Sequence, residues 1–199
     1  DGRPAGIVAN NSMFLGGALD CDSADKAARF VWLCDAFGIP LLFLQDTPGF
    51  VVGSKMEQQG IIRHGAKMLH AVSEATVPKV TVLVRKAYGA GYFVMCGKAY
   101  EPDYIVAWPT AECAVMGPEG MVSIFARKML ESAPDPAAMK EQLAGKIREQ
   151  IDPFIPAEFG LIDDVIDPRE TREIVCKALK QSAHKTVERP WRKHGVYPV

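Results

Sequence analysis

The sequence predicts an α/β layered domain, and two observations carry that prediction. Short apolar runs alternate with amphipathic stretches through the first half of the chain, in the order strand, helix, strand, helix, strand, helix, strand. The run at residues 41–44 is apolar throughout and lies between two helical stretches. Such a run is typical of a strand that is buried on both faces of a parallel sheet, and the alternation builds layers of helices over it.

The first predicted elements are a strand at residues 6–10 and an amphipathic helix at residues 22–37. Asp22 or Ser23 is expected to cap the start of this helix, because a short polar side chain can accept a hydrogen bond from the first amides. Gly38 is expected at its end, since glycine adopts the left-handed conformation without strain.

A second helix starts near residue 61, because apolar and polar residues each recur there at steps of 4, 3 and 4. Strands are predicted at residues 80–84, 104–108 and 113–116, and a glycine-rich segment leads into a further helix after the first of them. The apolar face of the second helix comprises Ile61, Gly65, Met68 and Val72, and its polar face comprises Arg63, Lys67, His70 and Glu74.

The last third of the chain predicts a loop at residues 132–136, a polar helix at 139–150 and a short strand at 161–166. Asp167, followed by Pro168 and Glu170, predicts a helix that runs to about residue 184. The tail, residues 188–199, carries Pro190, Trp191 and Pro198 and is expected to pack on another surface.

Composition limits the possible functions. The 199 residues fit one large globular domain, over residues 1–199, or two small ones. They are 48% hydrophobic and 24% charged, with a net charge of −1, which predicts no nucleic-acid partner. The longest apolar runs are far too short to span a bilayer, so no membrane role is expected.

The five cysteines are an odd number and lie far apart, so we expect reduced thiols and a cytoplasmic location. The four histidines lack metal-ligand spacing, so we expect no metal. The abrupt start, without Met, predicts a piece of a longer chain.

Gly89, Ala90 and Gly91 form the first candidate site, at the junction of a strand and a helix. The small residues let a ligand approach the backbone closely, and the amides of the first helical turn point outward with the positive end of the dipole behind them. Two such amides can hold an oxyanion. Close packing of helix on strand is the alternative interpretation, and the dinucleotide-binding pattern is incomplete here.

The second candidate is the turn that follows the buried strand, because ligands bind at the carboxyl ends of strands in open α/β sheets. Pro48 and Gly49 indicate a tight turn. Phe50 and Val51, with Val52, place apolar side chains in a loop that should otherwise be polar. A plain strand-to-helix connection is the alternative.

Side chains of the usual catalytic types are few. No G-x-S-x-G motif occurs. Glu112 and Glu119 are possible acid/base residues, although a carboxylate at Glu119 also suits a helix start. His64 and His70 lie on the second helix, where surface or salt-linked roles are the simpler interpretation. Arg85, with the lysine after it, either attracts an anionic substrate or closes a strand end in water.

These motifs together resemble the C-terminal half of the carboxyltransferase (β) subunit of biotin-dependent acyl-CoA carboxylases, of the propionyl-CoA and methylcrotonyl-CoA type. The resemblance covers nearly the whole chain. Six collinear motifs carry it: residues 46–50 (DTPGF), 60–67 (GIIRHGAK), 77–82 (VPKVTV), 85–92 (RKAYGAGY), 107–112 (AWPTAE) and 160–169 (GLIDDVIDPR).

The resemblance implies a crotonase-like (ClpP/crotonase) fold, a spiral of β-β-α units. It also implies transfer of a carboxyl group from biotin, held on a separate carrier protein, to an acyl-CoA. The implied partners are a biotin carboxylase or biotin carrier subunit, the N-terminal half of the same subunit, and further copies in a homo-oligomer, usually a hexamer. The implied location is the cytoplasm, or the mitochondrial matrix in a eukaryote.

The resemblance also assigns roles within the chain. The amides of Ala90 and Gly91, in the Gly89–Ala90–Gly91 segment, are implied to hold the ureido oxygen of biotin. The implied substrate-binding residues around them are Pro48, Gly49, Phe50, Val51, Tyr88, Tyr92 and Phe93. Relatives often read Gly-Gly-Ala at the glycine segment, and propionyl-type enzymes often carry Asp at the position of Phe93, which leaves the acyl group open.

Three alternatives stay open at this point. One is a biotin-dependent acyl-CoA decarboxylase subunit, in which the flux is reversed. Another is a crotonase-type hydratase or isomerase that uses Glu112 and Glu119. The third is a half without activity, retained for assembly or carrier docking.

Overall fold

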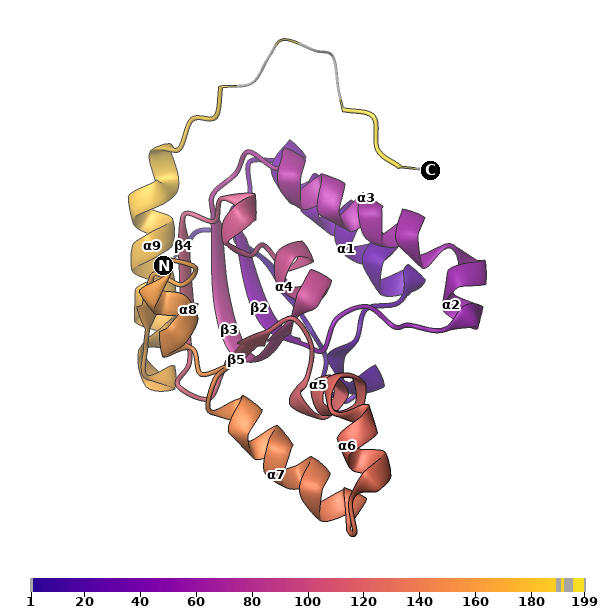
Figure 1. Cartoon of the computed structure of the whole chain (residues 1–199). Coiled ribbons are helices and arrows are strands. Elements are labelled where there is room, and N and C mark those ends of the chain that lie inside the picture. Colours follow the sequence, from indigo (N-terminus) through magenta and orange to yellow (C-terminus); the bar gives the residue numbers. More distant parts are fainter. Residues whose placement is uncertain (1, 189–190, 192–194, 199) are drawn as a thin grey trace.

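The computed structural model describes residues 2–188, 191 and 195–198 and shows the predicted alternation of strands and helices (Figure 1). The strands are β1 Gly6–Ala9, β2 Leu41–Thr47, β3 Lys79–Tyr88, β4 Tyr104–Ala107, β5 Glu112–Ala114 and β6 Asp164–Val165. The α-helices are α1 Cys21–Ala36, α2 Ser54–Gln59, α3 Ile61–Glu74, α4 Gly89–Val94, α5 Pro118–Phe125, α6 Arg127–Ser132, α7 Pro136–Arg148, α8 Phe154–Glu158 and α9 Thr171–Gln181.

All pairs in the six-stranded sheet are parallel, in the order β1-β2-β3-β4-β6, with β5 also on β3. The long β3 organises this arrangement. Its first half pairs with β4 and its last three residues pair with β5, so it extends beyond β4. Because the strands are parallel, the segments that follow β1, β2, β3 and β5 all leave from one edge of the sheet, called the carboxyl edge below.

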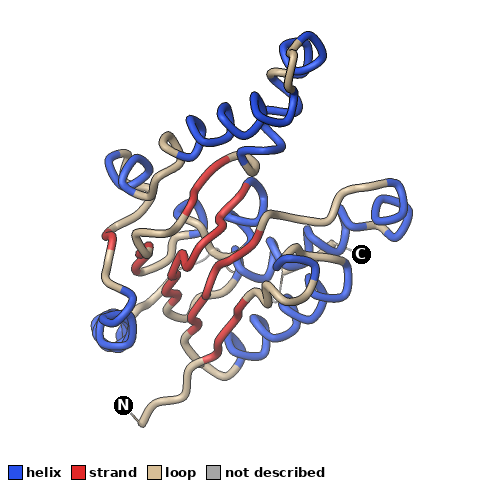
Figure 2. Tube along the Cα trace, turned by 90° about the horizontal axis from the view of Figure 1, so that it is seen from below, coloured by secondary structure: helices blue, strands red, loops and turns tan. Residues whose placement is uncertain are grey.

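Helices cover both faces of the sheet, as Figure 2 shows from below. On one face, α1, α3 and α4 pack on β2 through a cluster that includes Val31, Phe43, Met68 and Met95. On the other face, α9 packs on β3 and β4. The predicted burial of β2 on both faces therefore holds in part: alternate residues from Leu41 to Thr47 are fully buried, and those between them are half-buried.

The start of α1 corrects one prediction. Its N-cap is Asp20, not Asp22 or Ser23. The Asp20 carboxylate accepts from the Ser23 amide at 2.9 Å, and the Ser23 hydroxyl accepts from the Asp20 amide at 2.8 Å. This reciprocal capping box satisfies two amides, which a cap two or three residues later would not do. Gly38 follows the helix end with a φ of +65°, as predicted.

The last third is more helical than predicted. Ser132 ends α6 and Pro136 starts α7, so the predicted loop at 132–136 is shorter, and α7 starts before residue 139 because Asp135 accepts from two amides of its first turn. The strand expected at 161–166 is reduced to Asp164–Val165. Asp167 is the predicted cap, but a 3-10 turn, Pro168–Glu170, precedes α9, and another, Ser182–His184, follows it.

The helices α5, α6 and α7 form an arm that stands away from the sheet in both Figure 1 and Figure 2. The sequence indicated α5 only through Glu119, and α8 was not predicted. In the tail, the Tyr197 ring lies edge-on to Trp32 with centroids 4.7 Å apart, which agrees with packing on another surface. Trp191 is exposed, and Pro190 lies outside the described residues.

Two helical glycines make a matched test of packing. At Gly65 in α3, an added Cβ would lie 2.9 Å from the Phe50 ring, whereas at Gly145 in α7 nothing lies within 4 Å. We expect Gly65→Ala to lower the free energy of unfolding by about 1–3 kcal/mol, because the ring must move. Gly145→Ala is expected to raise it by about 0.5–1 kcal/mol, because alanine favours the helix. Chemical denaturation measures both, and equal effects would contradict the packing of Phe50 on α3.

Candidate active site

The glycine segment lies at the carboxyl edge, where β3 passes directly into α4. Tyr88 is the N-cap, so Gly89, Ala90 and Gly91 are the first three residues of the helix. Amides in a first helical turn have no partner four residues back within the helix. Ala90 is exposed, whereas Gly91 is buried. The amides predicted as an oxyanion site therefore lie where the prediction places them.

The two predicted candidate segments touch each other. A Cβ added at Gly91 would lie 2.7 Å from Thr47 Cγ2 and 2.9 Å from Gly49 Cα. The glycine allows the first turn of α4 to approach the turn after β2 at backbone distance. The structure thus brings both candidate segments into contact. Their spacing along the chain did not predict this contact.

A network of hydrogen bonds holds the turn after β2. The Asp46 carboxylate accepts from the Lys86 amide at 3.2 Å and from the Arg85 guanidinium at 2.9 Å. The Asp46 amide donates to Asn10 at 3.1 Å, and the Gly49 amide donates to the Thr47 hydroxyl at 3.1 Å. Of the two roles considered for Arg85, the structure favours fixing the end of the strand, because its charge is paired with Asp46.

Phe50 and its neighbours have different surroundings: Phe50 packs on the protein, and Pro48 faces solvent. The Phe50 ring packs on Gly65 of α3, and the backbone around Phe50 bonds to Leu19: the Leu19 amide donates to Gly49 and the Val51 amide donates to Leu19, at 2.9 and 2.8 Å. Pro48 is exposed and Val51 is half-buried. Phe50 is half-buried like Val51, so within this turn Pro48 is the residue most available to a ligand.

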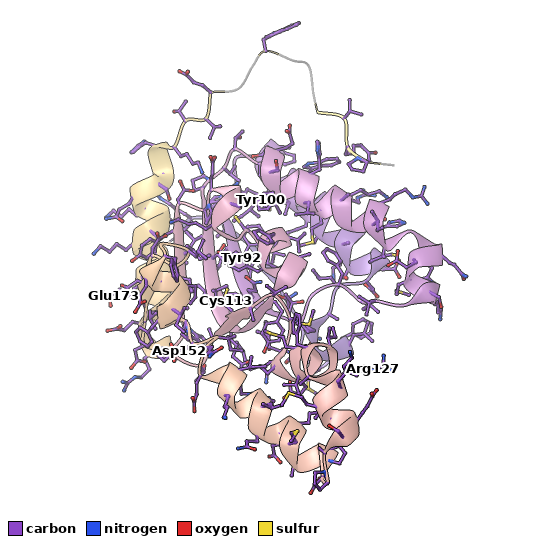
Figure 3. All side chains as sticks on the ribbon, viewed as in Figure 1. Tyr92, Tyr100, Cys113, Arg127, Asp152 and Glu173 are labelled. Atoms are coloured by element: carbon purple, nitrogen blue, oxygen red, sulfur yellow. The ribbon has the colours of Figure 1, made fainter. Side chains whose placement is uncertain are left out.

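The aromatic residues around the glycine segment also differ in role. Tyr92, which is labelled in Figure 3, is buried. Its hydroxyl donates to the Leu161 carbonyl at 3.1 Å and accepts from the Lys98 amide at 3.0 Å. Burial raises the pKa of Tyr92, so it stays a protonated donor. Tyr88 is buried as well, whereas the Phe93 side chain is 43% exposed. Of these three rings, only Phe93 is presented to solvent.

The two candidate acid/base carboxylates are brought together by an arginine that the sequence reasoning missed. Arg148, the last residue of α7, bonds to Glu119 and lies 3.8 Å from Glu112. The pKa of Glu119 is lowered, first by a hydrogen bond from its own backbone amide and then by Arg148. A catalytic acid/base needs a pKa near the working pH, so this pairing disfavours the hydratase interpretation.

His64 is salt-linked, as predicted, whereas His70 is half-buried. His64 Nδ1 lies 2.8 Å from the Asp25 carboxylate, which also pairs with Lys67 at 3.3 Å. His70 lies edge-on to Trp32. In the part of the chain that the structure describes, no group of three or more His, Cys, Asp or Glu side chains could hold a metal ion.

Gln45 is a polar residue that the sequence reasoning did not single out. It is fully buried in β2, and neither carboxamide atom bonds to the described residues. Its signal in the sequence is a polar side chain at the end of an apolar run. A cavity of about 1060 Å³ is lined by residues of β1 and α1 and by Gly17 of η1 (Leu15–Gly17), with Asn10 and Met95 also in its wall.

Large apolar side chains are exposed in the segments that follow the strands at the carboxyl edge and at the end of α5. We call them the apolar rim; all are exposed, with Val52 at 86% and Phe125 at 81%. The rim comprises Phe14, Val52, Phe93, Val115 and Phe125. Exposed apolar patches of this kind mark surfaces that other molecules cover. Among the described helices, none is both long and apolar enough to cross a membrane.

Comparison with known proteins gives the same family throughout. Residues 1–197 match the carboxyl transferase domain family. The methylmalonyl-CoA carboxyltransferase 12S subunit of Propionibacterium freudenreichii is 49% identical over 199 residues, which cover 100% of this chain and 38% of that protein. The methylmalonyl-CoA decarboxylase subunit alpha of Propionigenium modestum is also 49% identical, over 200 residues, covering 100% of this chain and 39% of that one.

A solved structure agrees. Transcarboxylase 12S, crystallised with methylmalonyl-coenzyme A and methylmalonic acid and described as a hexamer assembly, superposes with a TM-score of 0.89 at 48% identity, over 98% of this chain and 38% of that one. The chain thus spans well under half the length of these relatives, and the predicted α/β crotonase-like fold is confirmed. The match along the whole chain, in sequence and in fold, places this protein in the carboxyl transferase domain family.

Proposed function

We propose that this chain is the biotin-side half of an acyl-CoA carboxyltransferase. In that reaction a carboxyl group leaves the ureido nitrogen of carrier-bound carboxybiotin and joins the α-carbon, or the vinylogous γ-carbon, of an acyl-CoA. The proton that this carbon loses is left on the ureido nitrogen of biotin. The observation that carries the proposal is the junction of β3 and α4, where first-turn amides lie beside the turn after β2. Enzymes of this family act on charge that develops on an oxygen, and such amides stabilise it.

The residues divide the work between the backbone and apolar side chains. The amides of Ala90 and Gly91 are proposed to donate to the ureido oxygen of biotin. Pro48 and Phe93 are exposed and Val51 is half-buried, and these three residues are proposed to supply apolar contact. Gly49, Phe50, Tyr88 and Tyr92 are proposed to shape the site from behind, because their side chains or backbones are packed inside. No side-chain base is required, since positioning and charge stabilisation supply the rate.

The direction of flux is a second question, because one relative at the same identity is a decarboxylase subunit. A carboxylase-type subunit would carry activity without sodium, whereas a decarboxylase subunit coupled to a membrane pump would show sodium-dependent turnover in its complete assembly. We favour transfer to an acyl-CoA. Activity of this chain alone with saturating acyl-CoA would exclude a purely structural half.

The apolar rim supports the proposed partners. The N-terminal half of the subunit and neighbouring copies in a homo-oligomer, a hexamer as in transcarboxylase 12S, are proposed to cover it. A biotin carboxylase or biotin carrier subunit delivers carboxybiotin. The acyl-CoA would then reach the amides from the covering half. We expect the assembly in the cytoplasm, or in the mitochondrial matrix of a eukaryote.

The role of the amides is tested by Ala90→Pro in the complete subunit. Proline removes one donor but is tolerated in a first helical turn, where that amide has no helical partner. We expect the rate of carboxyl transfer from biotinylated carrier to fall on the order of 100- to 1000-fold, as for other oxyanion donors. Steady-state kinetics measures the effect, with circular dichroism to confirm folding.

Ala90→Gly is the matched control, because it removes the methyl group and keeps the amide. We expect its turnover to stay within a few-fold of the unaltered subunit. Unchanged turnover in a folded Ala90→Pro variant would refute the role of the Ala90 amide.

The covered rim is tested by Phe125→Asp. A buried charge at an interface costs binding energy, so we expect the dissociation constant of the assembly to rise at least tenfold (~1.4 kcal/mol). Phe37→Asp is the control: this phenylalanine is similarly exposed, at 74% against 81% for Phe125, but lies at the opposite edge of the sheet, at the end of α1. Sedimentation velocity measures both. Intact assembly in Phe125→Asp would show that the rim is not an interface.

A further inference from the structure

The residue that precedes the glycine segment is anchored by its side chain. Tyr88 is 5% exposed, and its ring lies against Gly117, where an added Cβ would be 3.3 Å from Tyr88 Cε2. Its hydroxyl donates to the Glu112 carboxylate. Burial first, and then this hydrogen bond, raise the pKa of Tyr88, so the phenol stays a donor. The start of α4 is thus tied to β5 through a side chain as well as through the strand pairing of Tyr88 with Ala114.

Arg148 extends this connection to the arm. The guanidinium bonds to Glu119 in the first turn of α5 through Nη2, and its Nε lies 3.8 Å from Glu112 Oε1. Arg148 itself ends α7. One guanidinium therefore joins the two ends of the arm to the carboxylate that holds Tyr88.

The segment that joins β5 to the arm touches the glycine segment directly. A Cβ added at Gly89 would lie 2.7 Å from the Val115 carbonyl oxygen. The stretch from Glu112 to Glu119 thus meets the start of α4 at its backbone and at the Tyr88 side chain. Movement of this stretch toward α4 would therefore press on Gly89.

We propose that Tyr88 and Arg148 are positioning residues for the amides of Ala90 and Gly91, acting through Glu112. This inference rests on the proposed function, in which those amides bind the ureido oxygen. Neither side chain needs to touch substrate. Backbone donors stabilise developing charge only when they are held at the correct place, and displacement of about 1 Å can cost on the order of 100-fold in rate.

Four variants in the complete subunit test the proposal: Tyr88→Phe, Arg148→Ala, the two combined, and Arg148→Lys. Tyr88→Phe removes one oxygen and keeps the ring. We expect kcat for carboxyl transfer to fall by about tenfold in each single variant, with KM for the biotinylated carrier changed less than about threefold. The fall in kcat of the double variant should be no larger than that of the more impaired single variant, because both residues act through one network. Arg148→Lys keeps the positive charge but loses the planar guanidinium that can bond to two carboxylates, so its kcat should lie between those of Arg148→Ala and the unaltered subunit.

Arg127→Ala is the control. Arg127 lies on the same arm (Figure 3) and pairs with Glu131 at 2.9 Å on the exposed surface of α6, without contact to Glu112 or Tyr88. We expect its kcat to be unchanged. The positioning role would be overturned if the fall in kcat of the double variant equalled the product of the two single falls. It would also be overturned if kcat of Tyr88→Phe stayed within twofold of the unaltered subunit.

Hydrogen exchange separates this inference from the proposed function. If the network holds the first turn of α4, Tyr88→Phe and Arg148→Ala will each speed amide exchange in residues 88–95 while leaving α3 as it is. That result supports the network even if the unaltered subunit transfers no carboxyl group, which would refute the proposed function alone. Unchanged exchange in both variants would overturn the network whatever the activity.

Discussion

The close approach of two backbones at the carboxyl edge is the constraint on which the site depends. Gly91 in the first turn of α4 lies against Thr47 and Gly49 at distances that leave no room for a side chain. This contact aligns the end of β3 with the end of β2, and it is possible only because the strands are parallel and adjacent. The position of the amides proposed to act in catalysis is set by this contact.

Much of the surrounding sequence holds that contact in place. Asp46 ties the turn to the end of β3 through Arg85 and the Lys86 amide, and Phe50 fixes the other side of the turn on α3. Tyr92 attaches α4 to the segment before β6 through the Leu161 carbonyl. Residues that resemble binding-site aromatics thus serve to hold the backbone, which is expected where the backbone supplies the chemistry.

The electrostatics of the site follow the same division. Its nearby carboxylates are paired: Asp46 with Arg85, and Glu119 with Arg148. Such pairing leaves the peptide dipoles at the start of α4 without a competing free anion from these side chains. The apolar rim lies around them, so a covering surface would exclude water and strengthen these dipoles. The proposed function therefore depends on assembly as much as on the residues of this chain.

The sequence by itself determined the alternation of elements, the apolar face of α3, the glycine segment at the start of α4 and the family that its motifs resemble. These features depend on local spacing and backbone dihedrals, which short stretches of chain encode. Only the tertiary structure decided that the turn at Thr47 meets Gly91 and that Arg148 pairs with a carboxylate 29 residues away. Such pairings depend on how packed elements bring distant side chains within bonding distance, and no periodicity along the chain records that.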